Sequence, residues 1–273
     1  MDALDGKVAV VTGAAGGIGL ALTRALARES MNVVMADIDA ARLAAAAETV
    51  ESRSGQDVIA VPTDVSDAAA VAELERRARD RFGRVHLLCN NAGVVIPPGR
   101  LWKVSREDFG WMLSVNLWGV VHGIQAFVPA MLEHGEPAHV VNTASIAGLL
   151  GFPRIGAYGA SKFAIVGLSE SLLQDLRERG ASIGVSVLCP GAIATELGEH
   201  SDRLRTGASP GVNGSTDDGP RAALEDLAVQ VIDAVHANRF WILTHPGYRE
   251  SLVARHEAML RGAELLTAPG FFQ

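Results

Sequence analysis

The sequence has no uninterrupted run of about eighteen apolar residues, the minimum that a membrane-spanning helix needs. It also has no cluster of basic residues, and its formal net charge is −7 at pH 7. Because nucleic acids bind positively charged surfaces, this balance argues against a nucleic-acid partner. Residues 1–6 include two aspartates and lead directly into an apolar run, so we expect no signal peptide. We therefore expect neither a membrane protein nor a nucleic-acid-binding protein.

Patterns typical of metal binding are missing as well. The eight histidines include no pair at His-x-x-x-His spacing, and the two cysteines form no Cys-x-x-Cys motif. Since zinc and similar ions need several such ligands close together, we expect no metal site.

The sequence does contain a regular alternation of short apolar runs and longer helical segments. The apolar runs predict seven strands, at residues 7–12, 33–36, 58–61, 85–89, 140–144, 183–188 and 240–243. The segments between them predict helices at residues 20–27, 67–82, 105–132, 158–179, 222–237 and 248–266. The chain has 273 residues, 48% of them hydrophobic, which suits one large domain spanning residues 1–273. We expect an α/β fold, a doubly wound three-layer sandwich around a mostly parallel seven-stranded sheet.

A glycine-rich turn follows the first expected strand. The sequence GAAGGIG at residues 13–19 precedes a helical segment. Glycine permits close backbone approach, and the free N–H groups of a helix N-terminus bind anions such as phosphate. Asp37 ends the second strand, eighteen residues after Gly19, where a carboxylate can bind ribose hydroxyls. The combination predicts a nucleotide site; the alternative is an ordinary tight connection between strand and helix.

Tyr158 and Lys162 are four residues apart in an expected helix, so their side chains share one face. Lowering the pKa of a phenol by about three units requires roughly 4 kcal/mol. One positive charge about 4 Å away supplies roughly that much at an effective dielectric near 20. Ser145 lies thirteen residues before the tyrosine and offers a hydroxyl to a substrate oxygen. The spacing predicts a proton-transfer site, although a Tyr-x-x-x-Lys pair also arises by chance.

Further motifs lie along the chain in a fixed order. They are TGAAGGIG from Thr12, Asp64-Val65, Asn90-Asn91-Ala92-Gly93, Asn116, Ser145, Tyr158 with Lys162, and Pro190-Gly191 with Thr195. In these motifs the chain resembles the short-chain dehydrogenases/reductases in their single-domain form, over residues 7 to about 244. The resemblance implies a Rossmann-like fold that binds a nicotinamide cofactor.

The resemblance also implies roles for cofactor-binding residues. The pyrophosphate contacts would be Gly13, Gly17, Ile18 and Gly19; the adenosine contacts would be Asp37, Asp64 and Val65. Asn90 would position a strand end against the cofactor, and Ile193, Thr195, Tyr158 and Lys162 would contact the nicotinamide half.

The catalytic residues implied by the resemblance are Asn116, Ser145, Tyr158 and Lys162. Ser145 would orient an alcohol, the Tyr158 phenolate would take its proton, and Lys162 would lower the tyrosine pKa. The Asn116 backbone would hold a water that links Lys162 to solvent. A methyltransferase would leave Ser145, Tyr158 and Lys162 unexplained.

We expect NAD rather than NADP as the cofactor. Asp37 would repel a 2′-phosphate by up to roughly 4 kcal/mol at about 4 Å, and the following Ile38 offers no positive charge. Arg42, in the next helix, is close enough in sequence to reach back and weaken this preference. The alternatives are an NADP-dependent ketone reductase of the same fold and a catalytically inactive cofactor-sensing regulator.

The expected substrate is a lipophilic secondary alcohol or its ketone. Expected substrate contacts are Val95, Ile146, Ala147, Phe152 and Leu197, with only Arg154 basic among their neighbours. An unpaired substrate charge would be costly to desolvate there, whereas apolar surface gains about 25 cal/mol per Å² buried. Residues 196–220, rich in glycine, serine and aspartate, are expected to form a flexible irregular lid. The alternatives are a surface linker, or a lid that supplies polar specificity.

Three tryptophans, Trp102, Trp111 and Trp118, lie around the expected helix 105–132. They indicate core or subunit packing more than contact with a substrate. In the family the helices at 105–132 and 158–179 pack against another subunit, so we expect a homotetramer or a homodimer.

The two cysteines, Cys89 and Cys189, each end an apolar strand. The strand order of the family puts one strand between theirs, about 9–10 Å apart, too far for a disulfide. Two reduced cysteines indicate a cytoplasmic protein.

Overall fold

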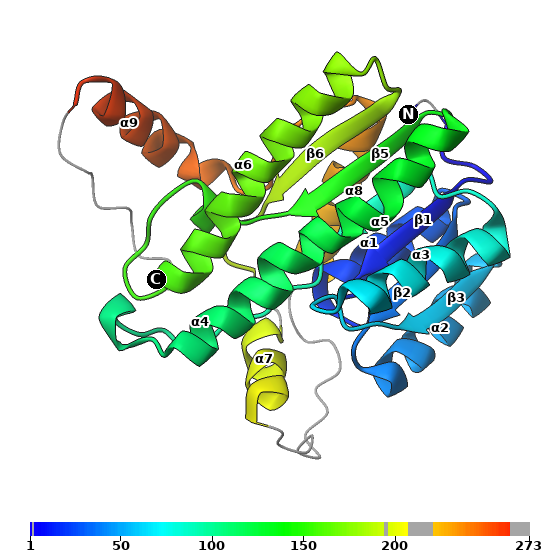
Figure 1. Cartoon of the computed structure of the whole chain (residues 1–273), viewed down its shortest axis with the longest axis horizontal. Coiled ribbons are helices and arrows are strands. Elements are labelled where there is room, and N and C mark those ends of the chain that lie inside the picture. The colour runs from blue at the N-terminus through cyan, green and yellow to red at the C-terminus, as the bar shows by residue number, and fades with distance from the viewer. Residues whose placement is uncertain (2, 194–195, 207–220, 263–273) are drawn as a thin grey trace.

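A seven-stranded parallel sheet forms the centre of the protein in a computed structural model, which describes residues 1, 3–193, 196–206 and 221–262 (Figure 1). The strands are β1 Val8–Thr12, β2 Asn32–Asp37, β3 Val58–Pro62, β4 Leu87–Asn90, β5 Ala138–Thr143, β6 Ile183–Cys189 and β7 Trp241–Leu243. Their order is β3-β2-β1-β4-β5-β6-β7, and every neighbouring pair is parallel. This confirms the predicted fold, and it turns all the carboxyl ends toward one edge of the sheet.

Helices cover both faces of the sheet. They are α1 Gly17–Arg28, α2 Ala40–Ser54, α3 Ala68–Phe82, α4 Arg106–Leu113, α5 Gly119–His134, α6 Gly156–Glu178, α7 Leu197–Thr206, α8 Arg221–His236 and α9 Arg249–Leu260. Alternate strand residues point to opposite faces. Ala9 and Val11 therefore pack with α1, α2 and α8, whereas Val8 and Val10 pack with α3, α5 and α6.

The predicted helix at 105–132 is one continuous helical stretch with an irregularity in its middle. Ser105 caps it by accepting a hydrogen bond from the Asp108 N–H at 3.0 Å. A π-helical turn, Ser114–Trp118, separates α4 from α5 and contains Asn116. Arg106–His134 is long and apolar enough to cross a membrane by length and composition alone. In this structure α5 packs against α3 and β4, and part of the apolar surface of the stretch stays exposed, for example at Trp118.

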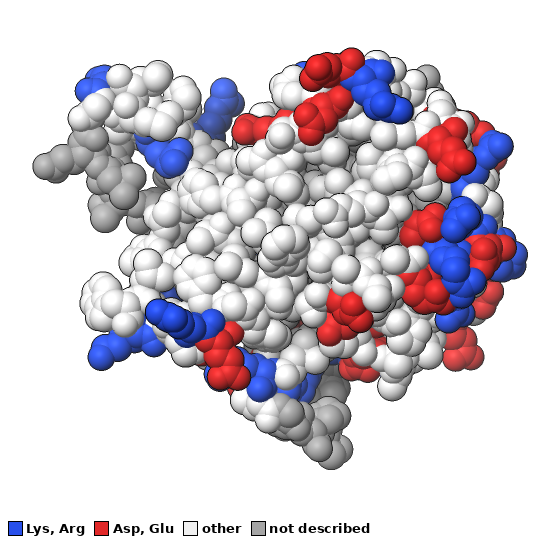
Figure 2. Space-filling model, in the orientation of Figure 1, with Lys and Arg blue, Asp and Glu red and all other residues white. Residues whose placement is uncertain are grey.

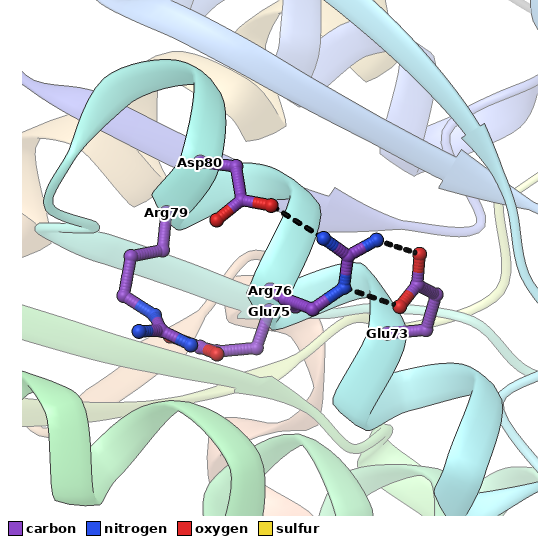
Figure 3. Close-up of polar contacts among 5 residues, drawn as sticks. All are labelled: Glu73, Glu75, Arg76, Arg79 and Asp80. Atoms are coloured by element: carbon purple, nitrogen blue, oxygen red, sulfur yellow. Dashed lines mark hydrogen bonds and ion pairs between the residues drawn. The ribbon is translucent and has the colours of Figure 1, made fainter.

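The solvent side of α3 carries a line of ion pairs (Figure 3). The Arg76 guanidinium donates to both carboxylate oxygens of Glu73, at 2.6 and 2.7 Å, and also pairs with Asp80. Arg79 pairs with Glu75 one turn away. Such exposed pairs add little stability, so α3 is held mainly by Val71, Leu74 and Ala78 on its buried face.

The prediction that residues 196–220 are irregular is wrong for their first part. Residues 197–206 form α7, and Ser201 is fully buried on the side facing the sheet edge. The polar composition of the segment concealed this helix, because Leu197 and Leu204, two turns apart, are its only large apolar residues. Residues 207–220 lie outside the described part of the chain. The last helix begins after a short 3₁₀ turn, Pro246–Tyr248, and the predicted residues 263–266 are also outside it.

Candidate active site

A cavity of about 330 Å³ opens at the carboxyl ends of the strands. Its walls come from the loops that follow β1 to β6, together with residues of α4, α6 and α7. Ligands of open α/β sheets bind at this edge, where the strand order reverses direction between β1 and β4.

The glycine turn forms one wall of the cavity. Gly13 has φ +66°, and a Cβ on it would lie 2.9 Å from the Ala92 Cα. Gly19 is needed for packing, because its Cβ would meet the Gly13 carbonyl oxygen at 2.1 Å. Gly13, Gly17 and Ile18 line the cavity, whereas Gly19 does not. The turn therefore brings the start of α1, with its free N–H groups, up to the cavity.

The carboxylates lie next along the wall. Asp37 ends β2 and accepts hydrogen bonds from the backbone N–H groups of Ala15 and Asp39, both at 3.0 Å. Asp64 accepts from the N–H and hydroxyl of Ser66, at 2.9 and 2.7 Å. Asp37, Asp64 and Val65 all line the cavity. Their backbone partners fix the orientation of both carboxylates.

The loop after β4 is held by side chains behind the wall. Thr12 Oγ1 accepts hydrogen bonds from the N–H groups of Asn91 and Ala92, at 2.9 and 3.0 Å. Asn90, one of the expected cofactor residues, is buried and donates to Asn142 Oδ1 at 2.9 Å. It supports β4 from inside and does not line the cavity.

Tyr158 and Lys162 line the cavity together, at the end opposite Asp37. The Lys162 Nζ donates to the Thr143 carbonyl at 2.9 Å and lies 5.7 Å from the centre of the Tyr158 ring. Ser145 is buried just behind this wall, where its hydroxyl accepts from the Ala147 N–H at 3.1 Å. Asn116 accepts from the Val94 N–H at 2.7 Å and donates to Val94 O and Ser161 Oγ. The four expected catalytic residues are thus close neighbours.

Electrostatics at this end differ from what the helical spacing predicted. Burial raises the pKa of Tyr158 to about 12, and a hydrogen bond with Ser145 opposes this rise. Burial lowers the pKa of Lys162 to about 8. The protein groups alone therefore keep the phenol protonated, and Lys162 does not outweigh the desolvation of the tyrosine. A phenolate needs additional positive charge nearby.

Apolar side chains line the cavity beside Tyr158. They are Val94, Trp111, Val115, Leu197 and Leu204. Among the expected substrate residues, Leu197 lies here, and the Val95 N–H donates to Ser201 Oγ of α7 at 3.0 Å. Ile146, Ala147 and Phe152 instead form a buried cluster with Leu150, which packs against Tyr158 but does not itself line the cavity.

Trp111 and Val115 were not predicted as site residues, although their spacing of one helical turn places them on one face. Trp102 and Trp118 are 77% and 51% exposed, so the alternative of core packing is wrong for these two. Ile193 packs against the core beside α1 and not on the cavity wall. Thr195 lies outside the described residues.

Helix α7 closes one side of the cavity through polar contacts at both ends. Glu196, just before the helix, accepts from Arg42 Nη2 of α2 at 2.9 Å. Arg205, near its end, pairs with Asp108 of α4 at 3.4 Å. His200, between these ends, lines the cavity, and burial lowers its pKa. Within the described ranges, no group of three or more His, Cys, Asp or Glu side chains lies close enough to hold a metal ion.

Comparisons with known proteins agree with this geometry. The sequence model of the family described as short chain dehydrogenase matches residues 7–205. The chain is 38% identical over 263 residues to 1-deoxy-11-beta-hydroxypentalenate dehydrogenase of Streptomyces exfoliatus, covering 96% of this chain and 91% of the relative. It is 31% identical over 273 residues to C alpha-dehydrogenase of a Sphingobium species, covering 95% and 87%. A solved structure of a short chain dehydrogenase/reductase from Burkholderia phymatum in complex with NAD is 40% identical, with a TM-score of 0.89 and coverage of 99% and 100%.

Proposed function

The chain belongs to the short-chain dehydrogenase/reductase family of oxidoreductases, and from this premise we propose that it uses NAD to interconvert a lipophilic secondary alcohol and its ketone. The observation that carries the proposal is a single continuous cavity with the glycine turn and Asp37 at one end and Tyr158 with Lys162 at the other. A dinucleotide cofactor would occupy both ends of the cavity, with its adenosine half at Asp37 and its nicotinamide half at Tyr158.

The residues of the cavity fit NAD. Gly13 and Gly17 leave room for a pyrophosphate beside the start of α1, where any side chain at Gly13 would meet Ala92. Asp37 would accept hydrogen bonds from the adenosine ribose, and Asp64 and Val65 would border the adenine. The nicotinamide half would lie beside Tyr158 and Lys162. When bound, NAD would supply the hydride acceptor, and the related structure from Burkholderia phymatum is in complex with NAD.

The chain's own residues would perform the proton transfer. Ser145 would hold the substrate oxygen next to the Tyr158 hydroxyl, since Ser145 lies close enough to the phenol to oppose the rise of its pKa. Tyr158 would take the alcohol proton in oxidation and return one to the ketone in reduction. Its pKa of about 12 must fall for oxidation, and Lys162 would contribute to this together with the positive charge of an oxidised nicotinamide. Asn116 would keep the loop at Val94 and the Tyr158 helix in register.

The proposed substrate class follows from the wall beside Tyr158. Val94, Trp111, Val115 and Leu204 offer apolar surface there, and Lys162 is the one basic side chain at that end among the described lining residues. The relative from Streptomyces exfoliatus is named for a hydroxypentalenate, which supports a substrate that bears a hydroxyl group. We propose α7 as the described part of the lid over this substrate.

The direct test is oxidation of an alcohol panel with NAD, followed at 340 nm. We expect a cyclic or aryl secondary alcohol to give a kcat/KM at least about tenfold above that of a short hydroxy acid, about 1.4 kcal/mol in transition-state binding. Trp111→Ala should reduce this advantage, because it removes the aromatic wall. Trp102→Ala, outside the cavity and on an exposed turn, is the matched control. A clear preference for the acid would reject the apolar pocket, and no turnover of any alcohol would reject the oxidoreductase assignment.

The proposed setting is a cytoplasmic homotetramer or homodimer. Cys89 and Cys189 are buried and unpaired, with the whole of β5 between them. These reduced thiols support a reducing compartment.

A further inference from the structure

Arg42 lies directly over the glycine turn. It is the third residue of α2, and a Cβ on Gly16 would lie 3.1 Å from its Nη2 atom. Arg42, Gly16 and Asp37 line the same part of the cavity. The guanidinium therefore stands beside the carboxylate that would bind the adenosine ribose.

Glu196 holds this guanidinium. Arg42 Nη2 donates to Glu196 Oε2 at 2.9 Å, and the two side chains are 38% and 37% exposed. Asp37 turns both of its oxygens to the backbone N–H groups of Ala15 and Asp39. Among the ion pairs of the described residues, Glu196 is the carboxylate that Arg42 engages.

We propose that Glu196 determines cofactor specificity by sequestering Arg42, the arginine among the described lining residues of the cavity that a 2′-phosphorylated dinucleotide would need. The inference rests on the proposed use of NAD. A 2′-phosphate next to Asp37 needs a positive partner, and arginine is well suited because its guanidinium can bind phosphate with two parallel hydrogen bonds. When Glu196 is present, Arg42 is already engaged in an ion pair with it. A 2′-phosphate would then face two carboxylates, Asp37 and Glu196.

The contact between Glu196 and Arg42 can be removed without endangering the fold. Both side chains are more than one-third exposed, and pairs of this kind add little to stability. A change at Glu196 should therefore appear in cofactor choice and leave the unfolding transition in place.

The test is direct binding of NAD and NADP to the full-length protein by isothermal titration calorimetry. We expect Glu196→Gln to lower the ratio of the NADP to the NAD dissociation constant about tenfold. Adding Arg42→Gln should abolish this gain, because the phosphate then loses its partner. The ratio of kcat/KM values for the two cofactors should shift in the same direction.

Asp108→Asn is the matched control. It removes the ion pair with Arg205 that holds the other end of α7. It therefore loosens the same helix at a point that is distant from Asp37. Its dissociation-constant ratio should equal that of the wild type. An unchanged ratio in Glu196→Gln, or the same shift in Asp108→Asn, would overturn the inference. A wild-type protein that binds neither dinucleotide would instead reject the proposed function.

Discussion

Tyr158 is half-buried in the cavity wall, where desolvation favours the protonated phenol. Lys162 is buried beside it and its own pKa falls to about 8, so most of the lysine charge is retained at pH 7. A further positive charge next to this pair would therefore lower the pKa of Tyr158. This arrangement makes the phenol hydroxyl, rather than the ring, the group on which turnover depends.

Tyr158→Phe should keep the fold and cofactor binding but lose nearly all turnover, because only the proton-transfer group is removed. Ser145→Ala should lose less turnover than Tyr158→Phe. Lys162→Met should weaken cofactor binding and also lower the turnover rate. Steady-state rates at 340 nm, with calorimetric titration of NAD as the control, measure these effects. More than about a tenth of the wild-type kcat in Tyr158→Phe, a barrier increase below about 1.4 kcal/mol, would reject the role of Tyr158.

His139 gives a prediction about stability. It is 1% exposed, its Nε2 donates to Ser186 Oγ at 2.8 Å, and burial lowers its pKa to about 3. Between pH 6.5 and 3 the unfolded chain therefore binds a proton that the folded protein does not, so stability falls as pH falls. From pH 7.5 to 5.5 this loss should be about 1.4 kcal/mol.

Urea unfolding of the wild type and of His139→Gln at the two pH values isolates this contribution. His86 is also buried with a lowered pKa and acts in the same direction in both proteins. The wild type should lose more stability on acidification than the variant does. Equal losses would mean that His139 is protonated in the folded protein.

Individual site residues differ in how far the sequence could identify them. Asp37, Tyr158 and Lys162 follow from spacing alone, because strand ends and helical turns convert sequence distance into position. Trp111 and Glu196 could not be identified this way. Their place in the cavity depends on how α4 and α7 pack across the sheet edge, which no local pattern encodes.

At the scale of elements, α5 can lie close to β4 because Gly123 of α5 has no side chain. A Cβ on Gly123 would lie 2.1 Å from the Asn90 Oδ1, and Asn90 is fixed by its bond to Asn142. Gly123→Ala gains about 1 kcal/mol in helix propensity but loses about 1–3 kcal/mol to overpacking against a side chain that cannot move away. We expect a net loss.

Gly110→Ala in α4 is the matched control for this prediction, since nothing lies within 4 Å of a Cβ there. It should be neutral or stabilising by up to about 1 kcal/mol. Urea unfolding midpoints compare the two variants. A Gly123→Ala protein as stable as Gly110→Ala would show that α5 can shift away from β4.

The elements themselves were predictable to very different degrees. Apolar runs placed all seven strands within a few residues, because buried parallel strands need continuous apolar sequence. The π-helical turn at Ser114–Trp118 has no such signature. Helix α7 was missed because its buried face includes a serine, Ser201, whose hydroxyl accepts from the Val95 N–H.

At the scale of the whole molecule, the surface is unevenly charged. Figure 2 shows a broad face without Lys, Arg, Asp or Glu at its centre, over α5 and α6, with the charges gathered around its rim. Trp118, the last residue of the π-helical turn before α5, is 51% exposed, and Phe163 of α6 is 37% exposed. Faces of this kind indicate contact with another protein surface.

We expect light scattering at micromolar concentration to give the mass of a dimer or a tetramer. Trp118→Glu should shift the protein toward the monomer, because it places a charge in the apolar face. Trp102→Glu, on an exposed turn outside α5 and α6, is the control. A monomer mass for the wild type would reject this interface.

The labelling rates of the two cysteine thiols in the sheet can measure how often the sheet opens locally. Cys89 and Cys189 are each 1% exposed, and burial raises the pKa of both to about 12, so neither should react with a thiol reagent while its strand is in place. Each labelling rate then measures how often that part of the sheet opens. Equal rates would mean that β4 and β6 open as one unit. Faster labelling of Cys189 would mean that β6, the strand beside Tyr158, opens on its own. One time course followed by mass spectrometry can therefore distinguish local opening near Tyr158 from global unfolding.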